Sequence, residues 1–166
     1  MKNILMCGIA LSLLSFSAGC HQDPDDTPTP TTGKFEFYAN GVLHQINNIV
    51  DVHKNTTTAG STLTIGATNA SSTESAIGGI DNYTGPATYD LSADISNYIG
   101  LTFNGKTYYL TGGNSLAPKS HGVVIVTDQT ITGNFKNTKG TFSGVAYASS
   151  TDSVTITGGV FEDDDF

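Results

Sequence analysis

Residues 35–46 read FEFYANGVLHQI, and this stretch sets the architecture of the whole chain. Apolar and other side chains alternate on both sides of Asn40-Gly41, which is the period of a β-strand. Asn-Gly favours a type I′ turn, because both central residues of that turn have positive φ. A two-residue loop then places Phe37 opposite His44 and gathers the apolar side chains on one face. The stretch predicts a β-hairpin with one buried face.

The same turn sequence occurs at Asn104-Gly105, again between two runs in which apolar and other residues alternate. A two-residue loop there places Leu101 opposite Tyr108. The register set by the turn therefore agrees with the register set by hydrophobicity, which supports both hairpins.

Further strands are predicted from shorter runs. Residues 62–69 alternate, residues 76–80 do so more weakly, and residues 91–96 are long enough only for a short helical turn. The continuous apolar run 123–127 is typical of a strand that is covered on both faces.

The C-terminal third ends in two more strands. Lys139-Gly140 predicts a turn, and Gly144 predicts a β-bulge in the strand that follows. Residues 153–161 form the last strand, in which we expect three apolar residues to share one face: Val154, Ile156 and Val160.

The fold class follows from this spacing. We count about nine to eleven short strands separated by turn residues, and no apolar face recurs at a period of 3.6. The sequence predicts an all-β protein, either an antiparallel β-sandwich or a partly open barrel. The β domain spans residues 34–161, and residues 162–166 form an acidic tail that we expect to stay solvated.

The N-terminus carries a targeting segment. An apolar run over residues 4–16 follows a single cation and is too short to span a bilayer, as in a secretory signal. The next residues, Ser17-Ala18-Gly19-Cys20, resemble a bacterial lipobox, which implies cleavage between Gly19 and Cys20 and lipid attached to Cys20. Burial of acyl chains contributes roughly 0.8 kcal/mol per CH₂, so two or three chains hold a protein on a membrane. An ordinary signal peptide with an incidental cysteine is the alternative.

Residues 20–33 form a tether between this cysteine and the domain. Alternating Pro and Thr in residues 27–32 favour an extended backbone. The acidic cluster at residues 23–26 is similar to the signal that carries lipoproteins of Bacteroidota to the outside of the outer membrane. A solvated linker is the other interpretation.

Composition excludes some partners. The chain has a net charge of −8 and only 7 Lys and Arg, whereas nucleic-acid binding requires clustered cations. Cys7 lies in the removed segment and Cys20 would be acylated, so we expect no internal disulfide. We expect a monomer whose membrane partner is reached through the lipid.

Several segments resemble a family of small, uncharacterised lipoproteins of Bacteroidota. These are residues 35–41, 83–89, 122–127, 131–135, 139–146 and 154–161. The resemblance implies the fold and the location, places Phe135 and Phe142 in the core, and brings no catalytic residue. Pro86 interrupts the family's Thr-Gly-x-Tyr segment.

No constellation for catalysis or metal binding stands out. The four His are far apart; we expect His44 to be packed, His53 to lie in a loop and His121 to begin a strand. The Gly-x-Ser-x-Gly elbow is absent, and Ser143 is expected to point outward from a strand. We therefore predict no catalytic residue and no cofactor. Calcium binding by three turn carboxylates is left open: Asp81, Asp90 and Asp94.

Exposed aromatic residues are the candidates for ligand binding. Tyr109, Tyr83 and Tyr89 are the candidates for stacking against a ligand, whereas Tyr108 is expected in the core. Ser153 follows Asp152 and precedes an apolar residue, which resembles the O-glycosylation acceptor of Bacteroidota.

The sequence thus leads us to expect a lipid-anchored protein of the outer membrane, exposed at the cell surface, with a non-catalytic β domain for binding or for structure. A glycan or a protein is the expected ligand. Two alternatives remain: a hydrolase of glycans or peptides with a carboxylate pair, and a carrier of a small apolar ligand.

Overall fold

The computed structural model describes residues 33–112, 120–132 and 135–165. Within these ranges there are eleven β-strands and no helix, which confirms the all-β class. The strands are β1 (Lys34–Ala39), β2 (Val42–Gln45), β3 (Ile49–Thr57), β4 (Gly60–Thr68), β5 (Ser75–Asp81), β6 (Ala87–Asp90), β7 (Tyr98–Phe103), β8 (Lys106–Leu110), β9 (His121–Thr132), β10 (Phe135–Ser149) and β11 (Asp152–Asp165).

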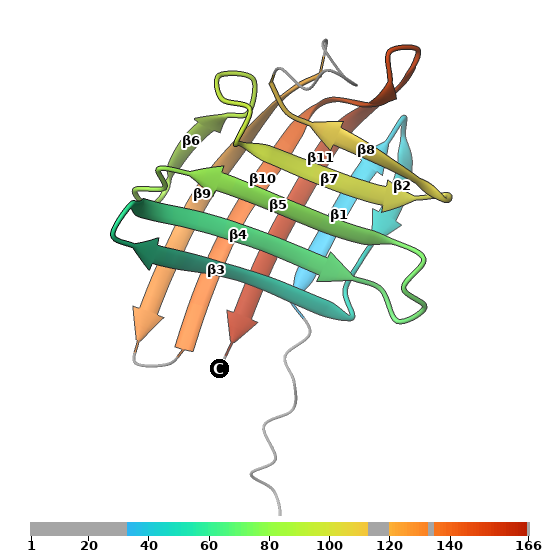
Figure 1. Cartoon of the computed structure of the whole chain (residues 1–166). Coiled ribbons are helices and arrows are strands. Elements are labelled where there is room, and N and C mark those ends of the chain that lie inside the picture. Colours follow the sequence, from blue (N-terminus) through green and yellow to red (C-terminus); the bar gives the residue numbers. More distant parts are fainter. Residues whose placement is uncertain (1–32, 113–119, 133–134, 166) are drawn as a thin grey trace, which may run out of the picture.

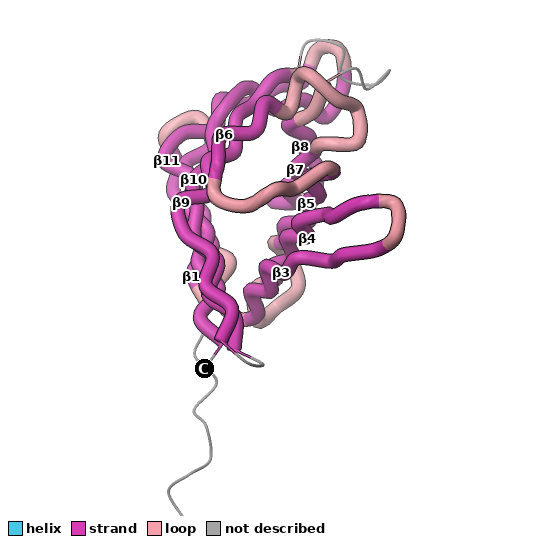
Figure 2. The backbone as a smooth tube through the Cα atoms, turned by 90° about the vertical axis from the view of Figure 1, so that its left-hand side faces the viewer, coloured by secondary structure: helices cyan, strands magenta, loops and turns pink. Residues whose placement is uncertain are grey.

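All strands belong to one antiparallel sheet that curls into a half-barrel. Its strand β10 pairs with β9 from Phe135 to Val145 and then with β8 through Tyr147 and Tyr109. This divides the sheet into a back layer, in the order β6-β9-β10-β11-β1-β2, and a front layer, in the order β8-β7-β5-β4-β3. Figure 1 shows the strands of the two layers crossing steeply, and Figure 2 shows the layers side-on.

Both predicted hairpins are confirmed. Asn40 and Gly41 have φ of 49° and 84°, and Asn104 and Gly105 have φ of 51° and 71°. These positive values are the ones that a type I′ turn requires, and Asn and Gly adopt them more readily than other residues.

The register of the first hairpin is also confirmed. Phe37 pairs with His44, and the amide of Ile46 donates to the carbonyl of Phe35 over 2.8 Å. Val42 is an exception to the expected apolar face, with 61% of its surface exposed. It stands next to the turn on the edge strand β2, where no neighbouring strand covers it.

The core lies between the two layers. Phe37 of β1 packs against Phe103 of β7 with ring centroids 5.6 Å apart, and Phe103 also contacts His44 at 4.4 Å. Phe142 joins the same cluster and is 2% exposed, as expected. Each such fully buried side chain contributes about 1.5–3 kcal/mol. The side chain of Phe135 lies outside the described residues.

The last strand contains a bulge that changes its phase. Gly159 pairs with Phe142, and Ile156 pairs with Gly144. Between these two pairs β11 therefore contains one residue more than β10, and Gly158 in this segment has φ of 56°. The register therefore shifts beside Gly144 as expected, but the additional residue lies in β11. Because one extra residue inverts the alternation, Val160 does not share the buried face of Ile156, and the expected three-residue face is wrong.

Two expectations about β9 and β10 are wrong. Ile125 is 40% exposed while Val124 and Val126 are buried, so residues 123–127 are covered on one face only. The back layer has the core on a single side. Lys139-Gly140 is no turn but lies within β10, where a Cβ on Gly140 would stand 2.3 Å from Cζ of Phe161.

The acidic tail is also corrected. β11 continues to Asp165, and Asp163 is only 2% exposed; its Oδ2 accepts a hydrogen bond of 2.7 Å from the amide of Val52. Residues 91–96 form turns rather than a helix, with the amide of Asn97 donating to the carbonyl of Asp94. The signal, Gly19, Cys20 and the tether up to residue 32 lie outside the described residues.

Candidate functional site

The three tyrosines expected to stack against a ligand have different surroundings. Tyr83 is 2% exposed, and burial raises its pKa to about 12, so its ring is not open to a ligand and that prediction is wrong. Tyr89 is half-buried, lies 5.5 Å from the Tyr83 ring, and donates its hydroxyl to the carbonyl of Gly85 over 2.6 Å. Tyr109 is half-buried at the junction of the layers, and Tyr108 is buried as expected.

A different tyrosine is open to solvent on the back layer. Tyr38 is 42% exposed and pairs with Leu43, which is 45% exposed. Its ring lies over Gly158, since a Cβ on that glycine would stand 3.3 Å from Cδ2 of Tyr38. The sequence contains the signal for this orientation: Tyr38 stands between the inward-facing Phe37 and Ala39.

Two neighbouring hollows lie on the outer side of the back layer. One, of about 260 Å³, is lined by Val123, Ile125, Thr141, Phe142, Ser143, Gly158, Gly159 and Val160. The other, of about 320 Å³, is lined by Asp90, Ser92, His121, Gly122, Val123, Ser143 and Gly144. Both include Val123 and Ser143, so we treat them as one surface and call it the outer groove.

Strand pairing explains the mixed lining of the outer groove. Thr141 pairs with Val160 on one side and with Ile125 on the other, while Ser143 pairs with Val123. Since one face of a sheet presents every second residue, hydroxyl and apolar side chains stand next to each other across the strands. Ser143 is exposed, as expected.

One end of the outer groove is polar. Asp90 accepts hydrogen bonds from the hydroxyl of Ser92 and, over 2.8 Å, from its amide. These bonds lower the pKa of Asp90, and the nearby His121 lowers it further. Asp90 is therefore ionised at neutral pH.

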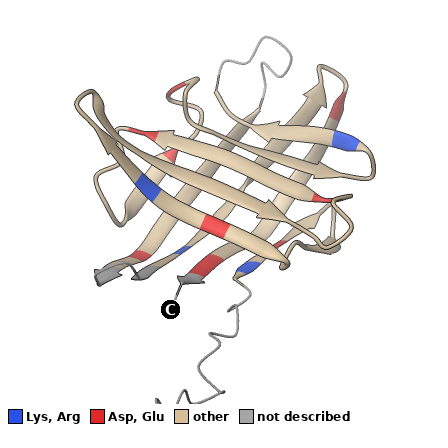
Figure 3. Ribbon diagram, turned by 60° about the horizontal axis from the view of Figure 1, so that its bottom comes forward, with Lys and Arg blue, Asp and Glu red and all other residues tan. Residues whose placement is uncertain are grey.

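Two Lys–Glu ion pairs lie on the back layer. Lys34 binds Glu36 over 3.0 Å, and Lys139 binds Glu162. Although burial raises the pKa of Glu36, hydrogen bonds from Lys34 and Gln45 lower it overall. Figure 3 shows charged residues spread thinly over the ribbon.

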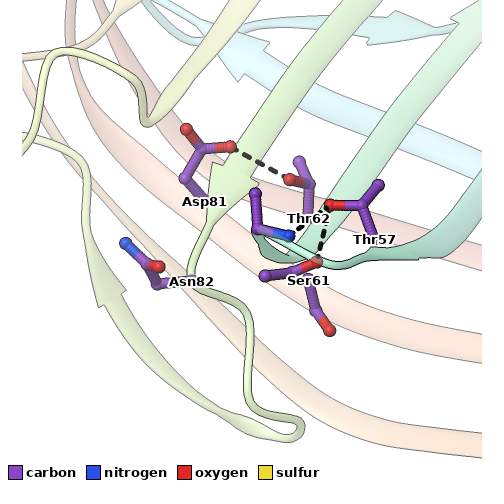
Figure 4. A pocket seen from close by; sticks show the side chains of 7 residues that line it. Thr57, Ser61, Thr62, Asp81 and Asn82 are labelled. Atoms are coloured by element: carbon purple, nitrogen blue, oxygen red, sulfur yellow. Dashed lines mark hydrogen bonds between the residues drawn. The ribbon is translucent and has the colours of Figure 1, made fainter.

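A second, smaller hollow lies at the β3–β4 turn and is shown in Figure 4. Its volume is about 170 Å³, and its lining is polar: Thr57, Ala59, Gly60, Ser61, Thr62, Asp81 and Asn82. Asp81 accepts a hydrogen bond of 3.1 Å from the hydroxyl of Thr62. Asn82, with φ of 55°, turns the chain so that the amide of Tyr83 reaches the carbonyl of Ser61. This polar hollow contains a single carboxylate and no exposed aromatic ring.

The three carboxylates considered for calcium serve separate local contacts. Asp81 binds Thr62, Asp90 binds Ser92, and Asp94 accepts from the amide of Ser96 over 2.9 Å. In the part of the chain that the structure describes, no group of three or more His, Cys, Asp or Glu could hold a metal ion.

The histidines are placed as follows. His44 is packed, 7% exposed, and its Nδ1 lies 2.9 Å from Glu74 Oε1, as expected for a buried imidazole. His121 begins β9, also as expected. His53 lies in β3 beside Asp51 rather than in a loop, which corrects that prediction.

The predicted acceptor Ser153 is exposed near the start of β11. The preceding Asp152 is held by Lys106 over 2.6 Å and by the hydroxyl of Tyr108 over 3.3 Å. O-glycosylation of Ser153 stays a prediction.

Comparisons with protein-family models, with curated proteins and with solved structures gave no match. Over residues 33–112, 120–132 and 135–165, no helix is long and apolar enough to cross a membrane.

Proposed function

We propose that this chain is a lipid-anchored protein of the outer membrane, displayed at the cell surface, whose β domain binds a ligand in the outer groove without catalysing a reaction. The observation that carries the binding role is the exposed Tyr38 ring, which lies over Gly158, a residue that lines the groove. The lipobox ending in Cys20 and the extended tether support the location. The resemblance to small lipoproteins of Bacteroidota supports the same location.

The composition of the groove supports binding over hydrolysis. Glycoside hydrolysis in most families uses two carboxylates across the scissile bond. The lining of the outer groove includes one, Asp90, and the polar hollow also includes one, Asp81. Neither surface supplies the pair that the hydrolase alternative requires.

The interior gives the carrier alternative no comparable support. Side chains from the two layers meet directly, as Phe37 does with Phe103, and a Cβ on Gly122 of β9 would stand 3.2 Å from Leu110 of β8. The outer groove, in contrast, is lined by exposed side chains.

The anchor is tested by labelling cells with radioactive palmitate. We expect label on the full chain and none on Cys20→Ser, and we expect externally added protease to degrade the β domain on intact cells. An unlabelled wild-type chain, or a domain that is protected until the cells are broken, would refute the proposed location.

The non-catalytic role is tested by incubating the full chain with a broad panel of glycan and peptide substrates. We expect no turnover. Turnover that Asp90→Asn or Asp81→Asn abolishes would identify an enzyme and replace this proposal.

A further inference from the structure

We infer that the outer groove binds an extended, neutral oligosaccharide, laid across the strands with the apolar face of one sugar on Tyr38. This inference rests on the proposed function, because it names the ligand class of that same surface. The contacts of Tyr38, the exposed Gly158, the hydroxyl pattern, the charge and the length of the groove each support it.

The Tyr38 ring is an exposed flat surface next to the groove. Gly158 lies beneath it, and Leu43 stands beside it on the neighbouring strand. An aromatic ring offers a large apolar face together with a polar group at its edge. Sugars present a row of C–H groups on one face of the ring, and this row packs against such an aromatic surface.

Gly158 lines the groove and presents no side chain to it. It is exposed, and glycine at such a position lets a ligand approach the backbone closely. Gly159 also lines the groove, but a Cβ there would stand 2.7 Å from Cδ2 of the buried Phe142, so core packing accounts for that glycine. A substitution at Gly158 would also meet the Tyr38 ring, and its φ of 56° favours glycine.

The walls combine hydroxyl and apolar side chains. Thr141 and Ser143 can each donate and accept hydrogen bonds, as sugar hydroxyls do. Val123, Ile125 and Val160 stand beside them on the neighbouring strands β9 and β11 and suit the C–H faces of the sugar rings. The lining therefore matches a pyranose ring, which carries hydroxyl groups at its edge and C–H groups on its face.

Charge favours a neutral ligand. The residues that line the outer groove include no Lys or Arg, and the chain as a whole carries a net charge of −8. A phosphorylated, sulfated or uronic-acid chain would meet no Lys or Arg in this lining, and it would meet the carboxylate of Asp90. Asp90 suits a hydrogen bond from a hydroxyl of a terminal sugar instead.

The length of the surface that runs from Tyr38 along the groove favours a chain of several sugars. The lining of the groove extends from β11 across β10 and β9 to Asp90 of β6, and Tyr38 adjoins it from β1. Four strand spacings of about 4.8 Å each give a span of about 19 Å. An extended peptide is less suited, because peptides that bind sheets pair with an edge strand, whereas this groove crosses the strands of the layer.

The test uses the full chain in detergent micelles and electrophoresis through native gels that contain a polysaccharide. The neutral probes are mixed-linkage β-glucan, xylan, mannan and starch, and the acidic probe is polygalacturonate. We expect at least one neutral polysaccharide to retard the protein. We expect Tyr38→Ala to weaken this binding about tenfold and Tyr38→Phe to weaken it much less, since the ring face is kept.

The matched control is Ile77→Ala, which removes an apolar side chain of 57% exposure from β5 of the front layer. It should leave the retardation unchanged, and circular dichroism should show that all variants fold. Calorimetry should show affinity rising with the length of the oligosaccharide, and a monosaccharide that binds as tightly as a long chain would overturn the inference.

The inference is also overturned if only polygalacturonate retards the protein, if Tyr38→Ala binds a neutral polysaccharide like the wild type, or if no polysaccharide retards it. A photo-crosslinking residue at position 38, introduced in intact cells, then separates the two proposals. A cross-linked protein partner would leave the proposed binding function standing with another ligand class. With no glycan and no cross-link, the binding function fails as well.

Discussion

The buried carboxylate of Asp163 gives the sharpest test of how the C-terminal strand is held. Its Oδ2 accepts from the amide of Val52 over 2.7 Å, and the two residues are 2% and 0% exposed. Asp163→Ala leaves that amide buried without this acceptor, which costs about 1–3 kcal/mol, and bonds to charged groups lie toward the upper end. We expect the free energy of unfolding to fall by about 2–3 kcal/mol.

Two variants calibrate this value. Asp163→Asn keeps an acceptor oxygen, so its loss should be smaller, about 1 kcal/mol. Asp128→Ala removes an exposed carboxylate from β9 and should stay within about 0.5 kcal/mol of the wild type.

The assay is urea unfolding of the full chain followed by circular dichroism, with hydrogen exchange of the Val52 amide as the local measure. The midpoint of Asp163→Ala should fall with an unchanged slope, and its Val52 amide should exchange faster. An unfolding midpoint equal to that of Asp128→Ala, with Val52 equally protected, would refute the role assigned to Asp163.

Four further predictions concern packing and ionisation. Gly140→Ala should lower the free energy of unfolding by about 1–3 kcal/mol, because its Cβ would stand 2.3 Å from Phe161 Cζ and 2.5 Å from the carbonyl oxygen of Ile125. Gly66→Ala should raise it by about 0.4–1 kcal/mol in the same denaturation assay, since the nearest atom lies at 3.8 Å. A hydrogen bond from Lys106 lowers the pKa of Asp152. In Lys106→Ala, the pKa of the Asp152 carboxyl, measured by NMR, should therefore rise toward 3.8. Tyr83 should titrate at about 12 by ultraviolet absorbance, and its stabilising contribution should be complete below pH 10.0 and decline as the pH rises toward 12.

Each of these has a contrary outcome. Equal effects of the two glycine variants would show that close packing at Gly140 is not what excludes a side chain. The contribution of the Asp152 pair should be present above pH 3.8 and fade as the pH falls through the lowered pKa. An unmoved Asp152 titration in Lys106→Ala would assign the shift to another group, and ionisation of all tyrosines near pH 10.0 would contradict the burial of Tyr83.

The local parts of the fold could be predicted from the sequence. Asn40-Gly41 and Asn104-Gly105 fix turns through backbone conformations that these residues favour, and alternation then sets the register of both hairpins. These signals act over a few residues, so no tertiary information is needed to interpret them.

The parts that depend on distant partners could not be predicted. The acidic sequence around Asp163 favours a solvated side chain, and its hydrogen bond with the Val52 amide of β3 depends on a partner far away in the chain. One bulge residue in β11 reverses the phase of every residue after it, so Val160 was placed on the wrong face.

The candidate site shows the same limit. Alternation already turns Tyr38 outward, but its value as a binding residue depends on Gly158, a residue of the last strand that the fold brings beneath its ring. The buried position of the Tyr83 ring depends in the same way on other segments of the fold, which the sequence around Tyr83 does not reveal.

The pairing of β1 with β11 joins the first strand of the domain to the last. Until residues 152–165 have been synthesised, β1 has only β2 beside it, and β10 lacks the neighbour with which it shares its longest ladder. A nascent chain therefore has to complete its final segment before the sheet can close. A chain that terminates early would yield a species that proteases remove, rather than a smaller working domain.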